Sequence, residues 1–277
     1  MKDFHELRER ILKGMESLGG VSHIPGEYLS FRIGLYRGQL AAYDALAGAA
    51  IKSRIPLARE SLSFDPSVLE RLLRVASESL ALNSPMRADL AKLAEDRAKL
   101  EEVINAAVFG LDIGVLKRLA GELGAGEDTL LFFGRACAAP YVSRIVWPAA
   151  EVAADVSSGA GECPYCGSLP GLSILRGETG RRFLACSLCG MDWGFPRMKC
   201  PFCGAENSLE IMRENDSDPR WIEACSSCSR YLKTADERKL AGRAELIPLL
   251  ESVSTLYMDF IAEKHGCKRS APYVALI

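Results

Sequence analysis

The sequence predicts an α+β fold in which an N-terminal helical domain precedes a tandem β-hairpin domain and a C-terminal helix. Residues before about position 155 place apolar side chains at helical spacing and contain few β-prone runs. Four Cys-x-x-Cys pairs follow in short succession, and helical spacing returns after Asp236. We therefore expect a helical domain at 1–156, a metal-binding domain at 157–235, and a helix within 236–277 that packs on both.

The first two helices are predicted by apolar spacing and by the residues that stop a helix. One apolar stripe, with spacings of three and four, ends at Gly19 and Gly20. Its members are Phe4, Leu7, Ile11, Met15 and Leu18. A second segment, 31–55, is rich in Ala and Leu and ends at Pro56.

A third helix should begin at Pro66, because Asp65 is a favourable N-cap and proline is favoured at the first helical position. Prolines and glycines then separate further segments with helical spacing. These segments are 86–109, 112–123 and 127–156. The first half of the chain is therefore predicted to be helical throughout.

The Ser-Ser-Gly-Ala-Gly run at 157–161 predicts a flexible linker immediately before the first cysteine pair. Beyond it, short β-prone pieces alternate with turn residues, so that each cysteine pair would cap a hairpin. Three such pieces are 172–175, 182–185 and 221–224. A long helical segment then follows, which we expect Gly266 to end.

The cysteine pairs carry the clearest chemistry in the sequence. They are Cys163/Cys166, Cys186/Cys189, Cys200/Cys203 and Cys225/Cys228. The first three pairs are each followed by glycine, which lets the backbone turn so that N–H groups approach the sulfurs, as in zinc ribbons and rubredoxins. Ser229 replaces this glycine after the fourth pair, so we expect that turn to be strained or more open.

Two thiolates on one turn can hold one side of a metal ion, and a second pair completes a tetrahedron. Nineteen residues separate the first pair from the second, and twenty-one separate the third from the fourth, both close to the spacing of one ribbon. Sequential pairing therefore predicts one site from the first two pairs and another from the last two. An interleaved pairing is the alternative.

Four sulfurs in a tetrahedron suit zinc and iron equally, so the sequence predicts two metal ions per chain without deciding between these elements. A closed zinc site would be structural, whereas a single iron could change its oxidation state. A thioredoxin-like dithiol would instead require one pair beside a βαβ unit.

Other candidate residues have simpler interpretations. Cys137 lies within a helical pattern and is expected to be a small buried hydrophobic residue. Cys267 has no partner in the sequence, and His265 beside it is better explained by its place in the last helical turn than as a ligand. Trp193 and Trp221 are expected to form part of the ribbon core, with exposed anchors for a partner as the alternative.

Charge and composition limit the classes of function. The net charge is −2, and residues 160–233 contain nine basic and nine acidic side chains, so we do not expect nucleic acid as a partner. No apolar run approaches the roughly 20 residues of a membrane span, and the charged N-terminus differs from a secretory signal. We expect a cytoplasmic protein, where paired thiols bind metal more often than they form disulfides. No hydrolase or nucleotide-binding motif is visible, so we do not expect an enzyme.

The cysteine motifs and their neighbours resemble the bacterial formate dehydrogenase accessory proteins. The similar segments are Cys-Pro-Tyr-Cys-Gly-Ser-Leu-Pro at 163–170, Arg-Phe-Leu-Ala-Cys-Ser-Leu-Cys-Gly-Met-Asp-Trp at 182–193, Glu-Ala-Cys-Ser-Ser-Cys-Ser-Arg-Tyr-Leu-Lys at 223–233 and Leu-Tyr-Met-Asp-Phe-Ile-Ala-Glu-Lys-His-Gly at 256–266. The match covers about 110 residues, and the final seven residues differ from the ending of that family.

This resemblance implies a helical N-terminal part, a rubredoxin-like domain and a cytoplasmic role in maturing a molybdenum- or tungsten-dependent formate dehydrogenase. The implied partner is the catalytic subunit of that enzyme. Two alternatives remain open: a tandem zinc-ribbon protein that binds nucleic acid, and an iron-based maturation factor that performs redox or sulfur-handling chemistry.

Overall fold

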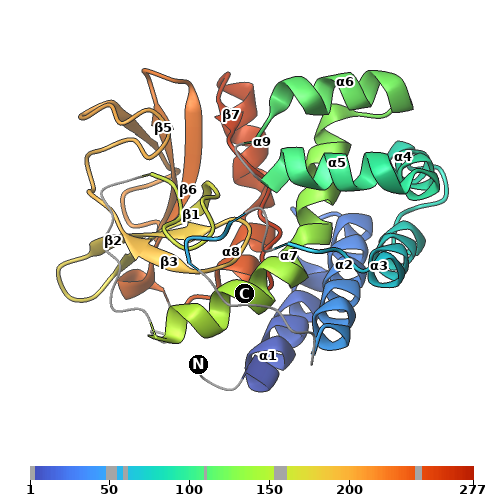
Figure 1. The fold of residues 1–277 in the computed structure, drawn as a ribbon. Coiled ribbons are helices and arrows are strands. Elements are labelled where there is room, and N and C mark those ends of the chain that lie inside the picture. The colour runs from blue at the N-terminus through green and yellow to red at the C-terminus, as the bar shows by residue number, and fades with distance from the viewer. Residues whose placement is uncertain (1–3, 48–54, 59–61, 109–110, 153–160, 241–244) are drawn as a thin grey trace.

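The computed structural model describes residues 4–47, 55–58, 62–108, 111–152, 161–240 and 245–277. Helices occupy the N-terminal half and a β-sheet follows, with two further helices after the sheet. Figure 1 shows the N-terminal helices on one side, the sheet on the other, and the C-terminal helices between them. The predicted α+β fold, with helices before and after a sheet of hairpins, is confirmed.

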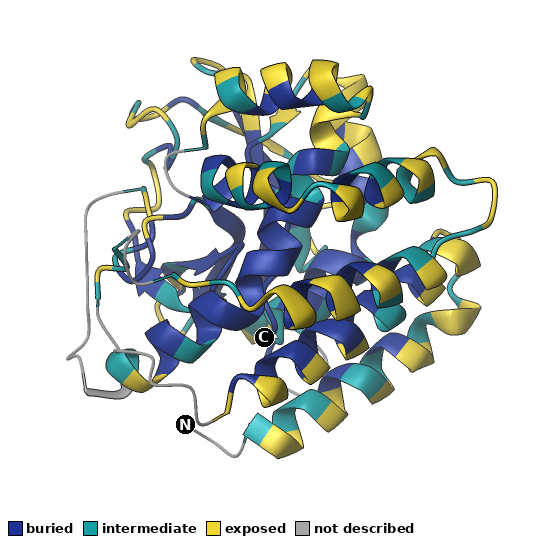
Figure 2. Cartoon of the chain, turned by 45° about the vertical axis from the view of Figure 1, so that its right-hand side comes forward, coloured by how far each residue is buried: buried dark blue, intermediate teal, exposed yellow. Residues whose placement is uncertain are grey.

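Seven α-helices make up the described part of the N-terminal half, and a short 3-10 turn at Leu18–Gly20 follows the first. They are α1 (Phe4–Ser17), α2 (Gly26–Ala45), α3 (Pro66–Glu78), α4 (Pro85–Glu95), α5 (Arg97–Val108), α6 (Ile113–Leu123) and α7 (Glu127–Val152). In Figure 2 the buried sides of the helices face the interior and their exposed sides face outward. This arrangement is what amphipathic helices around one core produce.

Two helix boundaries differ from the prediction. The predicted helix at 31–55 begins earlier, at Gly26, and ends at Ala45, while residues 48–54 lie outside the described part of the chain. The predicted helix at 86–109 is two helices, because Asp96 adopts an extended backbone conformation and its side chain accepts the N–H of Lys99 at 3.1 Å. Asp96 therefore caps α5.

The N-cap predicted for α3 is confirmed. Asp65 is extended, and its Oδ1 accepts the N–H of Ser67 at 2.8 Å. The pKa of the Asp65 carboxyl is lowered, chiefly by a hydrogen bond from the hydroxyl of Ser67. The backbone N–H groups of Val68 and Ser67 lower it further. Proline at the next position fits because the first helical residue needs no N–H partner.

The helix α7 packs against α5 and α2 and forms the centre of the molecule. Its side chains are buried over most of its length, including the large rings of Tyr141 and Trp147. Trp147 contacts Phe4 and Tyr43, with ring centroids 4.7 and 5.3 Å away. The sheet lies against this helix, so α7 connects the two halves of the structure.

The strands form one mixed sheet in the order β3-β2-β1-β6-β5-β4, with β7 beside β6. They are β1 (Pro170–Arg176), β2 (Arg181–Cys186), β3 (Asp192–Gly194), β4 (Leu209–Met212), β5 (Arg220–Cys225), β6 (Arg230–Asp236) and β7 (Lys268–Arg269). The three β-prone pieces of the sequence lie within β1, β2 and β5. Antiparallel pairing makes two ribbons, β3-β2-β1 and β6-β5-β4, and parallel pairing of β1 with β6 joins them.

A buried arginine holds the two ribbons together. The guanidinium of Arg182, on β2, lies 2.5 Å from the carboxylate of Glu223 on β5. It also donates to the carbonyl of Lys199 at 3.0 Å, in the segment between the ribbons. The ribbons therefore share one sheet and one buried ion pair, whereas the sequence alone predicted only that they follow one another.

The C-terminal helical segment is interrupted. Instead of one long helix, the structure has α8 (Pro248–Ser254) and α9 (Leu256–Lys264). The buried amine of Lys233 on β6 donates to the carbonyl of Ser252 and to Asp259, both at 2.9 Å. Burial lowers the pKa of this amine to about 8 against the opposing effect of Asp259. Lys233 thus fixes both helices to the sheet.

The last residues of the chain lie inside the molecule. Residues 273–276 are buried. Val274 donates its N–H to the carbonyl of Ser187 in the second cysteine pair at 2.9 Å, and its own carbonyl accepts from Gln39 on α2 at 3.1 Å. This segment, which we call the C-terminal tail, therefore connects α2 to the sheet.

The predicted domain boundary at 156/157 lies outside the described part of the chain, which omits residues 153–160. Most of the predicted linker at 157–161 lies in the same omitted segment. The three-part division of the chain stays a prediction. One cluster of buried side chains nevertheless includes residues from α7, from β1 and from the C-terminal tail.

Candidate metal centres

The eight sulfurs meet in two groups of four. Site one consists of Cys163, Cys166, Cys186 and Cys189, and site two consists of Cys200, Cys203, Cys225 and Cys228. Within each group all sulfurs lie within 4.8 Å of one another. The groups have the sequential pairing, and the interleaved alternative is therefore wrong. Among the described residues no third group of metal-ligating side chains is found.

The distances between sulfurs fit a tetrahedral metal site. In site one the sulfurs of Cys163 and Cys189 are 3.7 Å apart, and in site two those of Cys203 and Cys225 are also 3.7 Å apart. Four sulfurs bound at about 2.3 Å in a tetrahedron would be about 3.8 Å from one another. A disulfide would require about 2.05 Å. The two groups could therefore hold one metal ion each.

The four cysteine turns share one backbone geometry. In each, the residue after the second cysteine has a positive φ and donates its N–H to the carbonyl of the first cysteine, over 2.8 to 3.2 Å. These residues are Gly167 (φ 73°), Gly190 (φ 77°), Gly204 (φ 76°) and Ser229 (φ 55°). Ser229 has a Cβ in a conformation that favours glycine, so the strain predicted for the fourth turn has a structural basis.

Backbone and hydroxyl donors approach cysteine sulfurs in both sites. The N–H groups of Leu188 and Cys189 lie 3.4 Å from the sulfur of Cys186. The hydroxyl of Ser208 lies 3.3 Å from the sulfur of Cys225. Burial opposes ionisation of Cys225, but Ser208 and the N–H groups of the fourth turn outweigh it and lower the pKa of this thiol to about 6. Such donors favour the thiolate, which is the form that binds metal.

The two sites differ in their exposure. All four cysteines of site one are buried, whereas in site two Cys203 is exposed and Cys228 is partly exposed. Site one lies against α7, where the indole N–H of Trp147 donates to the carbonyl of Cys189 at 2.8 Å. Site two lies in the β6-β5-β4 ribbon. The same ligands therefore occupy an interior and a surface environment.

The remaining candidates behave largely as expected. Cys137 is buried, which raises its thiol pKa to about 12. Trp193 and Trp221 are buried within the ribbons, which confirms that they belong to the core. Cys267 is partly exposed, and its sulfur is 3.9 Å from the carbonyl of His265. Neither Cys137 nor Cys267 belongs to a metal-ligating group among the described residues.

Sequence reasoning missed three features of site one. The C-terminal tail covers its second turn, Ser168 and Ser187 are buried beside its cysteines, and Arg135 of α7 donates to both hydroxyls. Arginine and serine side chains are mostly exposed in folded proteins. The sequence therefore gave no indication that Arg135, Ser168 and Ser187 would be buried together.

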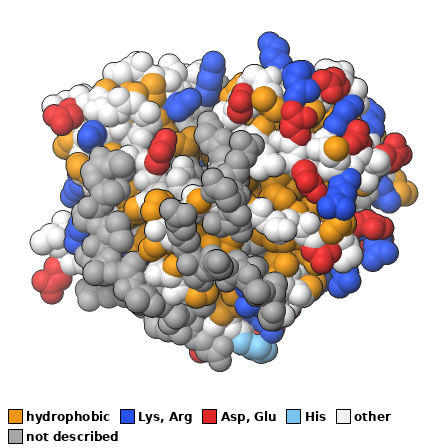
Figure 3. All heavy atoms as spheres, in the orientation of Figure 1, with side chains coloured by type: hydrophobic (Ala, Val, Ile, Leu, Met, Phe, Trp, Pro, Cys, Tyr) orange, Lys and Arg blue, Asp and Glu red, His pale blue; other side chains and the backbone are white. Residues whose placement is uncertain are grey.

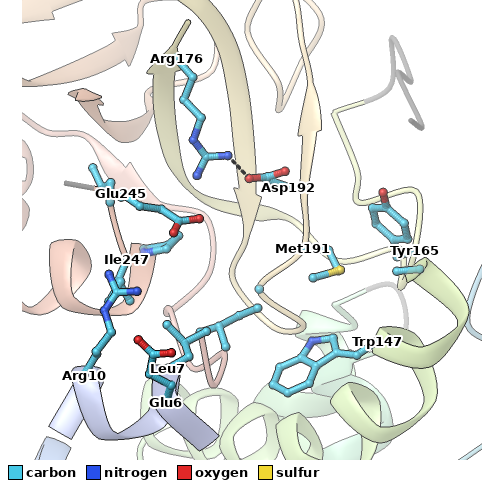
Figure 4. Close-up of a pocket in the computed structure, with 15 residues that line it drawn as sticks. Glu6, Leu7, Arg10, Trp147, Tyr165, Arg176, Met191, Asp192, Glu245 and Ile247 are labelled. Atoms are coloured by element: carbon cyan, nitrogen blue, oxygen red, sulfur yellow. Dashed lines mark hydrogen bonds and ion pairs between the residues drawn. The ribbon is translucent and has the colours of Figure 1, made fainter. Parts of the chain in front are cut away.

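A cavity of about 500 Å³ lies beside the second cysteine turn (Figure 4). Arg176 and Asp192 form an ion pair at its wall, and Arg10 and Glu245 extend toward it from other elements, as Figure 4 shows. None of the eight cysteines is among its lining residues in the described structure. The cavity therefore does not lead directly to the sulfurs of site one.

Charge is mixed on the visible surface. Figure 3 shows basic and acidic side chains interspersed over the helical half, without a continuous basic area on that face. Within the described residues, no helix has both the length and the apolar composition that a membrane crossing demands.

Comparison with known proteins gives consistent similarities. The family model described as the FdhE central domain matches residues 162–197, which include site one. An FdhE homolog of Edwardsiella ictaluri is 28% identical over 232 residues, covering 82% of this chain and 71% of that protein. One from Haemophilus influenzae is 24% identical over 285 residues, covering 97% of this chain and 87% of that protein.

The fold is also similar to a solved structure. The crystal structure of the FdhE protein from Pseudomonas aeruginosa superposes with a TM-score of 0.63 at 23% sequence identity, covering 97% of this chain and 94% of that one. The shared fold, the relatives along most of the chain and the match over the first two cysteine pairs agree. The chain is therefore similar to the FdhE proteins over most of its length, and its segment 162–197 matches the FdhE central domain.

Proposed function

We propose that this protein is a non-catalytic accessory factor in the maturation of a formate dehydrogenase, and that it acts in the cytoplasm by binding the catalytic subunit. The observation that carries the proposal is the pair of four-cysteine groups inside a chain that is similar to the FdhE proteins over most of its length. The expected client is a molybdenum- or tungsten-dependent enzyme.

We further propose that each group of four cysteines binds one metal ion, zinc or iron. The fit is supported by the 3.5 to 3.8 Å spacing of the sulfurs across each group and by the N–H donors that approach Cys186. A bound zinc ion would supply structural cross-linking, and a bound iron ion could in addition exchange one electron. Four thiolates leave no position for a substrate, which favours a structural role.

In this account the protein's own residues supply the binding surface. Site one fixes the first ribbon against α7 and the C-terminal tail, and site two keeps the turns of the second ribbon together. Most large apolar side chains are buried, but Met198, in the segment that leads to site two, has 60% of its surface exposed. Met198 and Ile211, which lies on β4 and is 56% exposed, are therefore apolar side chains in and beside the second ribbon that a protein partner could cover.

The direct test is an anaerobic pull-down of the formate dehydrogenase catalytic subunit from the same cell. Wild-type protein should capture the subunit. A Cys203→Ser variant, in which site two is incomplete, should capture less if the second ribbon forms the contact. Absence of capture by folded, metal-loaded wild-type protein would contradict the proposed partner.

A matched pair of surface variants locates the contact. Met198→Glu places a charge beside site two, and Leu82→Glu places the same charge in the helical half, where Leu82 is 87% exposed. Neither position is buried, so both variants should remain folded. Loss of capture in the first variant alone would assign the contact to the second ribbon, and loss in the second alone would assign it to the helices.

One observation favours a second candidate function, redox or sulfur-handling chemistry at site two. Cys203 is exposed and Cys225 has a lowered thiol pKa, so this site is the more open to reaction. Protein purified without oxygen would then contain iron and show a reducible visible chromophore. A colourless protein with two zinc ions would exclude the iron-based form of this function.

A further inference from the structure

One arginine is buried beside site one. Arg135, in the middle of α7, has 2% of its surface exposed. Its Nη2 donates to the hydroxyl of Ser168 at 2.8 Å and to that of Ser187 at 2.7 Å. Ser168 follows the first cysteine turn and Ser187 lies within the second, so a single guanidinium group contacts both turns of the site.

The same guanidinium reaches the helical half. Its Nη1 donates to the carbonyl of Ala107 on α5 at 3.1 Å. Ser187, in turn, donates to the carbonyl of Leu169 at 2.7 Å, and its own carbonyl accepts from the C-terminal tail. Arg135 is therefore the point at which two helices and both cysteine turns are joined by hydrogen bonds.

The charge of Arg135 has no carboxylate partner among the described residues. The comparable arginine beside site two, Arg182, is also buried but forms an ion pair with Glu223. The hydrogen-bonding partners of Arg135 are neutral oxygens, and its Nε has no hydrogen-bonding partner in the described parts of the chain. An uncompensated buried charge is strongly destabilising, so a negative group is required nearby.

The cysteines of site one supply that group. Burial lowers the pKa of the Arg135 guanidinium, and the opposing effects come from Cys186, Cys166 and Cys189. A divalent metal with four thiolates has a net charge of about −2. Such a centre, enclosed by protein, needs positive charge as much as the arginine needs negative charge.

We propose that Arg135 is the counter-charge and positioning residue of site one, which retains the metal ion by compensating the charge of its four thiolates and fixing its two turns. This inference rests on the proposal that site one binds a divalent metal. It assigns to one residue of the helical half a direct effect on the metal site of the ribbon half.

The test measures how fast each cysteine of zinc-loaded protein reacts with an alkylating reagent, by mass spectrometry of the peptides. Removal of groups that support metal ligands commonly reduces metal affinity 10- to 100-fold. Arg135→Met should therefore speed alkylation of the four site-one cysteines about tenfold or more. The site-two cysteines of the same molecules are an internal control and should change less than twofold.

Further variants separate charge from packing. Arg135→Lys retains the charge and should recover most of the protection, while Arg135→Gln is a milder neutral variant that retains a polar amide donor in place of the guanidinium. Arg144→Met removes a second guanidinium of α7, which donates to the carbonyl of Tyr43 on α2 at 2.8 Å. It should leave the site-one cysteines protected.

Iron-loaded protein gives a readout that packing alone would not change. Removing a positive charge disfavours the more negative reduced centre, so one of the two iron centres should become harder to reduce in Arg135→Gln and not in Arg135→Lys. Unchanged protection and potential in both neutral variants would overturn the proposal. The proposal would also be overturned if the Met, Gln and Lys variants of Arg135 all lost protection equally at site one and at site two. Wild-type site-one cysteines that react as fast as those of unfolded protein would instead refute metal binding itself.

Discussion

Site one and site two each consist of four cysteines on the same kind of turn with nearly the same spacing of sulfurs, yet they lie in different environments. Site one is buried between α7, the C-terminal tail and the first ribbon, whereas site two has one exposed cysteine, Cys203. The cysteine motif thus gives both groups the same possible ligands, while the surrounding structure gives them different exposure, which would affect how firmly a bound ion is held.

The difference extends to the neighbouring charges. The buried arginine beside site one depends on the thiolates for compensation, whereas Arg182 near site two is compensated by Glu223. Loss of the metal from site one should therefore disturb the core, and loss from site two should remain local. Variants at each site should therefore differ in their effects on stability and on cysteine protection.

The largest effect is expected from removing one ligand of each site. Cys186→Ser and Cys203→Ser should each lower the metal content by about one ion. Cys186→Ser should also destabilise the whole fold, by roughly 3–5 kcal/mol, since it leaves a polar group and uncompensated charge in the core. Cys203→Ser should cost less, because its site lies at the surface. Metal analysis and urea denaturation measure both quantities.

The serine variants have a matched control in Cys137→Ser, which changes a buried cysteine that belongs to neither site. It should retain two ions. Equal losses of stability in the Cys186 and Cys203 variants would remove the proposed distinction between the sites, and an unchanged metal content in either would refute the ligand assignment.

Deletion of residues 273–277 should give the next largest effect. Tyr273, Val274 and Leu276 are buried, and each large apolar side chain contributes about 2 kcal/mol. The three side chains together would account for about 6 kcal/mol, but the unfolded chain already buries part of this surface, so the deletion should destabilise the fold by about 3–4 kcal/mol. It should expose the site-one cysteines to alkylation while leaving the site-two cysteines largely as they were. Equal exposure of both sites would show that the tail does not act on site one in particular.

A smaller effect is expected at the fourth cysteine turn. Ser229→Gly removes a Cβ from a backbone with a φ of 55°, so it should stabilise the protein by about 1 kcal/mol. Alkylation of Cys228 should slow accordingly. The reverse change at the matching position, Gly204→Ser, should destabilise by a similar amount. If Ser229→Gly lowers the midpoint of urea denaturation, the strain assigned to this turn is absent.

The cysteine groups could be predicted from sequence because their chemistry is local. Two cysteines three positions apart lie on one turn whatever the rest of the chain does, and ribbon spacing favours the pairing of successive turns. The start of α3 was predictable for the same reason, since Asp65 caps the residues that follow it. Such features depend on neighbours in the chain.

The features that distinguish the sites depend on contacts between distant residues. Arg135 meets Ser187 across 52 positions, and Gln39 meets Val274 across 235. Nothing in their sequence neighbourhoods indicates burial. The break at Asp96 was missed because the helical spacing continues through it, while its side chain caps the next helix. Fold class and the grouping of the cysteines were therefore accessible from sequence, and the environment of each group was not.

The central claim is that the protein has two four-cysteine metal sites, of which the buried one is retained and the exposed one exchanges. Native mass spectrometry of metal-loaded protein during challenge with a chelator tests it most directly, with parallel alkylation to identify the vacated cysteines. The account predicts an intermediate with one ion, in which the site-two cysteines have reacted and those of site one are protected. Simultaneous loss of both ions, or earlier reaction of the site-one cysteines, would contradict it.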